Sequence, residues 1–138
     1  MPRGLQSGYF KKNNPMNWYA QVMKKYADFE GRARRTEFWM FYLINLGIQL
    51  LAALMDYLLG TTIGEMPYGV IYILYGLAVF VPSLAVSVRR MHDIGRSGLT
   101  LLLMIVPVIG AVLLLLFALN DSQPGENKWG PNPKTSQL

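Results

Sequence analysis

The chain has 138 residues, of which 52% are hydrophobic and 15% are charged, and its net charge is +5 at pH 7. A chain of this length forms one domain, and its charged fraction is well below the roughly 25% of ordinary soluble domains. Because the chain contains no cysteine, disulfides, zinc–thiolate sites and a cysteine nucleophile are excluded.

The few charged residues are unevenly distributed. They gather in residues 3–37, 89–96 and 121–134, and the stretches between these segments are nearly free of charge. Basic clusters beside apolar stretches set membrane orientation or contact anionic headgroups. They do not line one continuous basic face, which is the footprint of a nucleic-acid-binding protein. We therefore expect membrane lipids and no nucleic acid among the partners, and we predict no cofactor and no metal site.

The amino-terminal region divides into two parts. Residues 1–15 are polar and show no periodicity, so we expect a disordered leader, and Met16 is an alternative start. Residues 16–37 contain an amphipathic helix and a basic motif. Four apolar side chains recur there at helical spacing: Trp18, Val22, Tyr26 and Phe29. This pattern predicts a short helix over residues 17–29 that either lies in the headgroup plane or packs against the ends of the spans.

Three long apolar segments follow: residues 38–59, 68–88 and 98–119. Each is long enough to cross a hydrocarbon core of about 30 Å at about 1.5 Å per residue. The sequence therefore predicts an all-α membrane protein, with about three transmembrane helices in residues 38–119 and a short amphipathic interfacial helix before them. The third segment contains Pro107 and Gly110, and the alternative is that it bends there into a re-entrant hairpin.

The distribution of Lys and Arg predicts the orientation. Loop 89–97 and the segment before the first span are rich in Lys and Arg, whereas loop 60–67 has none. The positive-inside rule then places the amino terminus and loop 89–97 in the cytoplasm. Residues 120–138 are dense in Asn, Pro and Gly, so we predict a turn-rich tail. With three spans this tail lies outside, and the hairpin alternative returns it to the cytoplasm.

Polar residues in the first span form a stripe. Asn45, Gln49 and Asp56 fall on one helical face, and Asp56 lies near the outer end, where we expect it to reach water. Such a stripe either packs against a neighbouring helix or forms part of a proton or ion path. The second alternative predicts an oligomeric transport component.

Two polar motifs meet at the cytoplasmic face. They are FEGRARRTEFW, residues 29–39, and VRRMHDIGRSG, residues 88–98. Seven of their residues are candidates for binding an anionic headgroup, a phosphate or a protein partner: Arg32, Arg34, Arg35, Arg89, Arg90, His92 and Arg96. Glu37 and Asp93 are expected to pair with arginines of the opposite motif as a structural clamp, because bidentate Arg–carboxylate pairs fix geometry.

Catalysis is the weakest of these alternatives. Adjacent residues on a helix point about 100° apart, so His92 and Asp93 do not form an acid–base pair by themselves. The chain contains no P-loop, no nucleophile elbow and no paired-carboxylate pattern. We therefore predict no catalytic residues. The leading hypothesis is a binding or accessory protein for anionic lipid or a protein partner, with a homo-oligomer among the alternatives; a transport component is second and a lipid-acting enzyme third.

Four elements of the sequence resemble a known family. They are G-R-A-x-R-x-E-F-W at residues 31–39, R-R-x-H-D-x-G-R-S-G at residues 89–98, the Pro107 and Gly110 pair, and PGENKWGPNP at residues 124–133. Together they resemble the small bacterial inner-membrane proteins catalogued as domain-of-unknown-function family 805, over roughly residues 16–134. The resemblance implies a bacterial inner membrane and no established activity. One departure is that Leu99 and Thr100 follow the second motif, where aromatic residues are common in the family.

Overall fold

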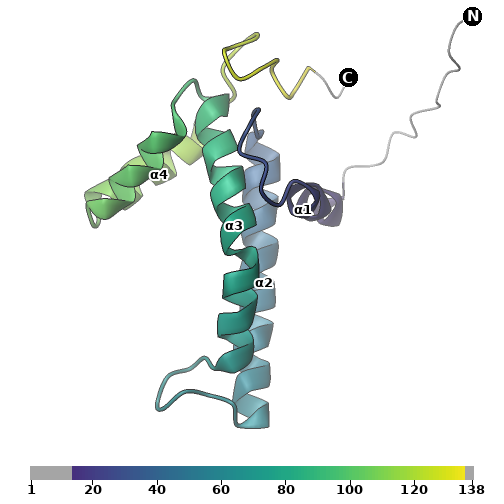
Figure 1. Cartoon of the computed structure of the whole chain (residues 1–138), viewed down its shortest axis with the longest axis vertical. Helices are drawn as coiled ribbons and strands as arrows, with labels where there is room; N and C mark the ends of the chain where they lie inside the picture. Colours follow the sequence, from purple (N-terminus) through teal and green to yellow (C-terminus); the bar gives the residue numbers. More distant parts are fainter. Residues whose placement is uncertain (1–13, 136–138) are drawn as a thin grey trace, which may run out of the picture.

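The computed structural model describes residues 14–135 (Figure 1), so most of the predicted leader, residues 1–15, lies outside the described residues. Five helices follow in order: α1 (Pro15–Lys24), α2 (Arg35–Leu59), α3 (Val70–Asp93), the 3₁₀ helix η1 (Gly98–Ile105) and α4 (Ile109–Leu119). Within the described range the backbone forms two isolated β-bridges but no strand. The prediction of an all-α fold is confirmed for this part of the chain.

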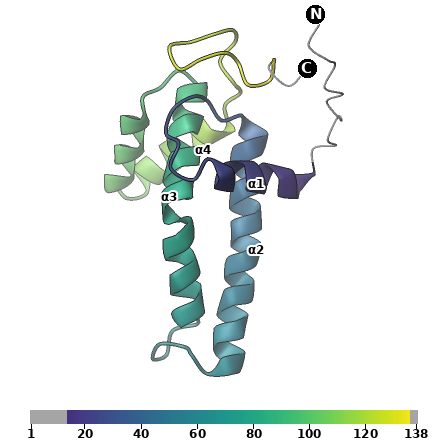
Figure 2. The same cartoon turned by 45° about the vertical axis from the view of Figure 1, so that its right-hand side comes forward.

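Helices α2 and α3 form a long antiparallel pair (Figures 1 and 2). Both are long and apolar enough to cross a bilayer, and only a small part of either helix is buried inside the protein. They correspond to the first two predicted spans, residues 38–59 and 68–88, and both extend further at the end that carries the basic motifs. The core helices of a soluble protein would be covered by other elements, whereas most of this apolar surface is bare.

The turn that joins α2 to α3 is organised by Asp56. Its carboxylate accepts hydrogen bonds from the backbone N–H groups of Gly69 (3.0 Å), Ile71 (3.0 Å) and Tyr72 (2.9 Å), so it caps the amino terminus of α3. The hydroxyl of Thr61 donates to it as well, at 2.6 Å. The expectation that Asp56 reaches water is therefore wrong, because these donors enclose the side chain and bury it completely.

Helix α1 lies across the α2–α3 pair, beside its upper half in the view of Figure 1. Its Val22 is fully buried and joins Phe41 of α2 and Val86 of α3 in a hydrophobic cluster. Of the two alternatives for this amphipathic segment, packing against the spans is the one that the structure shows. The helix is shorter than the predicted range, residues 17–29, because a turn follows directly after Lys24.

The third apolar segment, residues 98–119, is not one helix. It consists of η1 and α4, which fold back on each other as a hairpin (Figures 1 and 2). The expectation of a third continuous span is corrected accordingly, and the hairpin alternative describes this segment. With 8 residues in η1 and 11 in α4, both arms are roughly 16 Å long, about half the thickness of a hydrocarbon core.

Three residues at the tip of the hairpin produce the break. Pro107 has no N–H to donate to a continuing helix. Val108 has a φ of +64°, and the N–H of Ile109 closes a γ-turn by donating to the carbonyl oxygen of Pro107 at 2.7 Å. A Cβ on Gly110 would lie 1.7 Å from the carbonyl oxygen of Leu103. Only glycine therefore allows the two arms to approach this closely.

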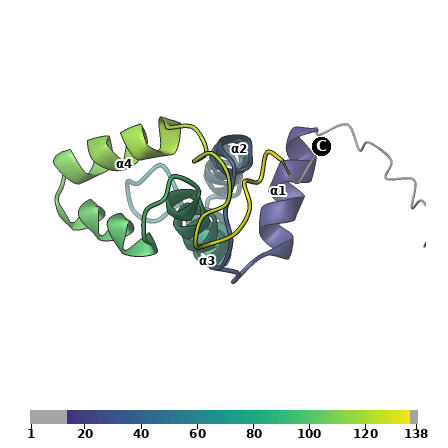
Figure 3. The same ribbon diagram turned by 90° about the horizontal axis from the view of Figure 1, so that it is seen from above.

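After α4 the chain returns to the end of the helix pair where α2 begins and α3 ends. Residues 120–135 pass over this end, as the view from above shows (Figure 3). The N–H of Gln123 donates to the carbonyl oxygen of Asp93 at 2.8 Å. We call this end, where residues 29–35 meet loop 89–97, the arginine end. The tail and loop 89–97 are therefore in contact, as the hairpin alternative expects, and the side of the membrane on which they lie stays a prediction.

Candidate functional site at the arginine end

The segment between α1 and α2 brings the first basic motif against α3. Gly31 has a φ of +81°, which suits glycine, and the N–H of Ala33 donates to the carbonyl oxygen of Arg89 at 3.0 Å. This backbone contact places the first motif beside the last turns of α3. Five charged residues of the two motifs are then buried together, and we call them the buried arginine cluster: Arg32, Glu37, Arg89, Arg90 and Asp93.

Asp93, the last residue of α3, is the centre of this cluster. One carboxylate oxygen accepts a hydrogen bond from Nε of Arg32 at 3.0 Å. The other accepts from Nη1 of Arg90 at 2.5 Å and from the hydroxyl of Ser122 at 2.6 Å. Hydrogen bonds between ionised partners are the stronger kind. The carboxylate therefore ties the amino-terminal motif, α3 and the tail to one another.

Arg32 and Arg90 use their other donors on backbone carbonyl groups. Arg32 donates to the carbonyl oxygen of Gln123 at 2.6 Å. Arg90 donates to the carbonyl oxygens of Ala118, at 3.3 Å, and of Asn120, at the carboxyl end of α4. A cation suits this position because the unpaired carbonyl groups of a helix end carry partial negative charge. The two guanidinium groups thus hold the tail and α4 against α3.

Arg89 and Glu37 form the second buried pair, with Nη1 and Oε1 2.9 Å apart. Glu37 lies in the first turn of α2, where a negative charge is favourable. The Nε and Nη2 atoms of Arg89 are buried and have no hydrogen-bond partner in the described part of the chain. With three arginines and two carboxylates, the buried arginine cluster carries one net positive charge.

His92 is covered by the tail. Its ring stacks on that of Trp129, with the ring centres 4.4 Å apart and the planes 9° from parallel. Its Nδ1 lies 3.1 Å from the carbonyl oxygen of Gly31, and Asn127 donates to the carbonyl oxygen of His92 at 3.0 Å. His92 and Asp93 therefore have separate partners. Nothing in this arrangement pairs them as a base and its orienting group.

The structure divides the predicted binding residues into two groups. Arg32, Arg89, Arg90 and His92 are buried in contacts within the protein, whereas Arg34 is partly exposed and Arg35 and Arg96 are exposed. Arg35 donates to the carbonyl oxygen of Leu119 at 3.3 Å. The guanidinium carbon of Arg96 lies 4.0 Å from the centre of the Phe117 ring. The surface open to a ligand is smaller than the sequence indicates, and both exposed arginines contact the last turn of α4.

The predicted polar stripe of α2 lies along α3. Oδ1 of Asn45 accepts a hydrogen bond from the hydroxyl of Tyr75 at 2.5 Å, and Nδ2 donates to the carbonyl oxygen of Phe41 at 3.0 Å. Gln49 is half-buried and shares the wall of a small cavity with Asn45. Asp56 caps α3. Two of the three stripe residues are thus engaged in contacts that join the helices, and no observation here favours the transport alternative.

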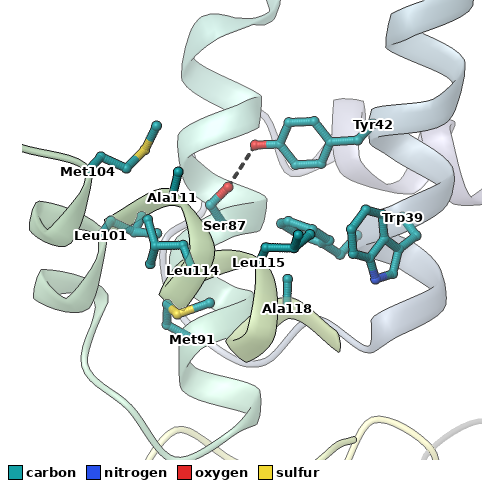
Figure 4. Close-up of a pocket in the computed structure, with 11 residues that line it drawn as sticks. Trp39, Tyr42, Ser87, Met91, Leu101, Met104, Ala111, Leu114, Leu115 and Ala118 are labelled. Atoms are coloured by element: carbon teal, nitrogen blue, oxygen red, sulfur yellow. Dashed lines mark hydrogen bonds between the residues drawn. The ribbon is translucent and has the colours of Figure 1, made fainter. Parts of the chain in front are cut away.

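A second feature of the arginine end is an apolar cavity of about 330 Å³ between the hairpin and the helix pair (Figure 4). We call it the hairpin groove. Its walls come from α2, α3, η1 and α4: Phe38, Trp39, Tyr42, Ser87, Met91, Leu101, Met104, Ala111, Leu114, Leu115 and Ala118. The two hydroxyl groups among them are satisfied, since Tyr42 and Ser87 share a hydrogen bond of 2.8 Å. The groove is therefore an apolar surface with no exposed charge of its own.

Sequence reasoning missed the contributions of the tail and of the hairpin groove. Ser122, Asn127 and Trp129 each contact the end of α3, yet a turn-rich segment has no periodicity to show which side chains point inward. The only indication in the sequence was the composition of PGENKWGPNP. A Trp among turn residues can stack on another ring, and an Asn there can form hydrogen bonds with backbone groups. The groove exists only because the third apolar segment folds back.

Together these features define a class: a membrane protein with two long apolar helices, a short apolar hairpin beside them and arginines buried at one end. The chain belongs to the family described as "Protein of unknown function (DUF805)", whose model matches residues 26–131. The resemblance seen in the sequence and the prediction of an all-α membrane protein are both confirmed.

Two relatives from Escherichia coli strain K12 illustrate the similarity. The chain is 43% identical to "Inner membrane protein YhaH" over 121 residues, which cover 86% of this chain and 98% of the relative. It is 44% identical to "Inner membrane protein YhaI" over 119 residues, which cover 86% of this chain and 97% of the relative. No solved structure is significantly similar to the chain. The family and the names of its members place these relatives in the inner membrane and assign them no activity.

Proposed function

We propose that this protein is an accessory protein of the bacterial inner membrane that holds anionic lipid headgroups at its arginine end. The observation that carries the proposal is the exposure of two arginines, Arg35 and Arg96, beside the last turn of α4. Both side chains are exposed, and both contact the last turn of α4 although they come from different parts of the chain. An exposed guanidinium group favours phosphate, which it binds through paired N–H donors.

The charge distribution supports a cytoplasmic position for this end. Loop 60–67, at the opposite end of the helix pair, has Glu65 but no Lys or Arg. The positive-inside rule then puts the arginine end, including the tail, on the cytoplasmic side. The cytoplasmic leaflet attracts basic segments at about 1 kcal/mol for each Lys or Arg near the surface.

The buried arginine cluster supports the same proposal in a different way. Its three salt bridges, Arg32 with Asp93, Arg90 with Asp93 and Arg89 with Glu37, lie inside the protein, out of reach of a ligand at the surface. They fix the start of α2 and the loop after α3, which carry the exposed arginines Arg35 and Arg96. The cluster is thus the scaffold, and the exposed guanidinium groups form the binding surface.

Lipid retention tests the proposal. The full chain is purified from bilayers of equal phosphatidylglycerol and phosphatidylcholine, and the retained lipids are counted by native mass spectrometry. We expect a preference for phosphatidylglycerol that falls about fivefold for each of Arg35→Gln and Arg96→Gln. The matched control neutralises two exposed lysines away from α4, Lys24→Gln and Lys128→Gln, and leaves most of the preference in place. Equal retention of both lipids by the wild-type chain would overturn the proposal.

A further inference from the structure

We propose that the hairpin groove binds one acyl chain of an anionic phospholipid whose headgroup lies at Arg35. This inference rests on the proposed function. It adds that the groove holds the acyl chain of the lipid whose headgroup binds at the surface. A guanidinium on the surface attracts any anionic headgroup, whereas a groove beside it selects a headgroup that carries a chain.

The walls suit a hydrocarbon chain. The lining side chains come from four helices and are apolar apart from the indole N–H of Trp39 and the hydroxyl groups of Tyr42 and Ser87, which bond to each other (Figure 4). A volume of about 330 Å³ is at the small end of the roughly 300–1,000 Å³ of ligand sites. It is enough for part of one acyl chain and too little for a whole phospholipid. An apolar occupant gains from contact with these walls, and a polar one loses its hydration.

The surface next to the groove carries the positive charge that an anionic headgroup needs. A shallower depression is lined by Arg35, Thr36, Trp39, Met40 and Leu119. Trp39 also lines the hairpin groove, so one side chain forms a wall of both. The hairpin groove and the depression that holds Arg35 therefore lie next to each other, on either side of the Trp39 side chain. Arg35 makes one hydrogen bond within residues 14–135, to the carbonyl oxygen of Leu119, and its other donors remain for a phosphate.

Trp39 adds an independent observation at the junction of the two depressions. Its indole Nε1 is buried and has no hydrogen-bond partner in the part of the chain that the structure describes. A buried indole N–H usually has a partner. The ester carbonyl groups of a phospholipid lie between the acyl chains and the phosphate, which is the position that Trp39 occupies between the groove and Arg35. An ester oxygen is thus the acceptor expected there.

The hairpin is built to stay in hydrocarbon, where acyl chains are the surrounding solvent. At its tip the N–H groups of Val106, Ile109 and Gly110 donate to carbonyl groups of the hairpin itself, Pro107 has no N–H, and among residues 106–110 only the N–H of Val108 lacks a backbone acceptor. Backbone at membrane depth must be satisfied within the protein. The outward side chains Ile105 and Val108 are among the most exposed apolar groups, at 77% and 75%. The groove therefore opens beside lipid and not beside water.

A photoreactive lipid tests the inference. Phosphatidylglycerol with a diazirine in one acyl chain is placed with the full chain in phosphatidylcholine nanodiscs, and the adducts are mapped by mass spectrometry. We expect saturable adducts on groove residues such as Met91 and Met104. Unlabelled phosphatidylglycerol should displace them at least tenfold better than phosphatidylcholine or glycerol phosphate. Leu50 and Leu54, exposed on α2, report labelling by bulk lipid that does not saturate.

Two neighbouring positions of α4 provide matched variants. Ala111→Trp fills the hairpin groove, whereas Val112→Trp places the same side chain at a position that is 51% exposed and does not line the groove. We expect Ala111→Trp to abolish the saturable adducts and Val112→Trp to leave them unchanged. The competition on the wild-type chain decides the matter even if Ala111→Trp fails to fold.

The outcomes separate the two proposals. A preference for phosphatidylglycerol with adducts spread evenly over the groove and over α2 overturns the acyl-chain site and leaves headgroup binding intact. If glycerol phosphate displaces the labelled lipid as well as phosphatidylglycerol does, the acyl-chain site is also overturned, because the headgroup then binds without its chain. The absence of any preference for phosphatidylglycerol over phosphatidylcholine overturns both proposals.

Discussion

The guanidinium of Arg89 and the carboxylate of Glu37 lie 2.9 Å apart, and both side chains are almost completely buried where α3 passes the first turn of α2. Arg89 makes this contact with one nitrogen, and its other two have no hydrogen-bond partner in the described structure. The pair is therefore balanced in charge but incomplete in hydrogen bonding. Removing one partner leaves an unpaired buried charge, whereas removing both leaves none.

This relationship predicts strong coupling between the two residues. Glu37→Leu or Arg89→Met alone should lower the free energy of unfolding by about 3–5 kcal/mol, the usual cost of breaking a buried ion pair. The double variant should regain most of the loss, because apolar residues of similar volume replace the pair. Unfolding in mixed detergent micelles measures all three variants. If the double variant loses the sum of the two single losses, the residues are not coupled and the interpretation is wrong.

The cap on α3 gives a second prediction. Asp56→Ala removes the acceptor for three backbone N–H groups and for the hydroxyl of Thr61, and it should cost about 2 kcal/mol. The amides of Ile71 and Tyr72 should then exchange hydrogen faster, while the arginine end keeps its protection. Asp28→Ala is the matched control, since Asp28 is an exposed carboxylate that accepts one backbone N–H. Unchanged exchange at the start of α3 would contradict the role of Asp56.

The hairpin gives a third prediction. Gly110→Ala would put a methyl group 1.7 Å from the carbonyl oxygen of Leu103, so the arms must separate. We expect a loss of about 1–3 kcal/mol, as for other overpacked sites. The distance between spin labels placed on η1 and on α4 measures directly how far the two arms separate. Gly76→Ala is the control, because that position has open space and alanine favours a helix.

Hydropathy predicts which segments lie in the membrane but not the direction in which they run. The first two spans emerge from composition alone, because α2 and α3 each contain an apolar stretch long enough to cross a bilayer. The third segment is equally apolar, and its fold depends on Pro107 and Gly110. Pro107 reveals a break, but the requirement for glycine at position 110 comes from the carbonyl oxygen of Leu103 on the other arm. That contact exists only after the chain has folded back.

The sequence predicts only part of the candidate site, for a similar reason. Opposite charges in two motifs at one membrane face indicate that Glu37 and Asp93 meet arginines. The motifs do not show which arginines are buried, because this depends on the tail. Ser122 and the carbonyl group of Gln123 complete the surroundings of Arg32 and Asp93. Neither residue has a signal in hydropathy or periodicity, so the sequence overestimates the exposed basic surface.

A fourth prediction concerns pH and the tail. Lys134 donates to the carboxylate of Asp121, which holds the pKa of that carboxyl below its ordinary value of 3.8. A lowered pKa in the folded state contributes stability above the ordinary pKa, and this is lost as the pH falls through the folded value. Lys134→Gln should raise the pKa of Asp121, as carbon NMR of the carboxyl group would show. Lys128→Gln is the control, because Lys128 does not bond to Asp121, and an equal shift in both variants would contradict the pairing.

The last prediction concerns the side of the membrane on which each segment lies. Because the hairpin returns the chain to the arginine end, cysteines introduced at Ser97 and Glu126 should react with an impermeant thiol reagent from the same side. A cysteine at Glu65, in the turn at the other end of the helix pair, should react only from the opposite side. The chain has no cysteine of its own, so each variant reports one position. In spheroplasts the positive-inside rule predicts that only the cysteine at position 65 is labelled before the membrane is opened. Labelling of positions 97 and 126 from different sides would mean that residues 98–119 cross the bilayer, in conflict with the hydrogen bonds that join Asp93 to Ser122 and Gln123.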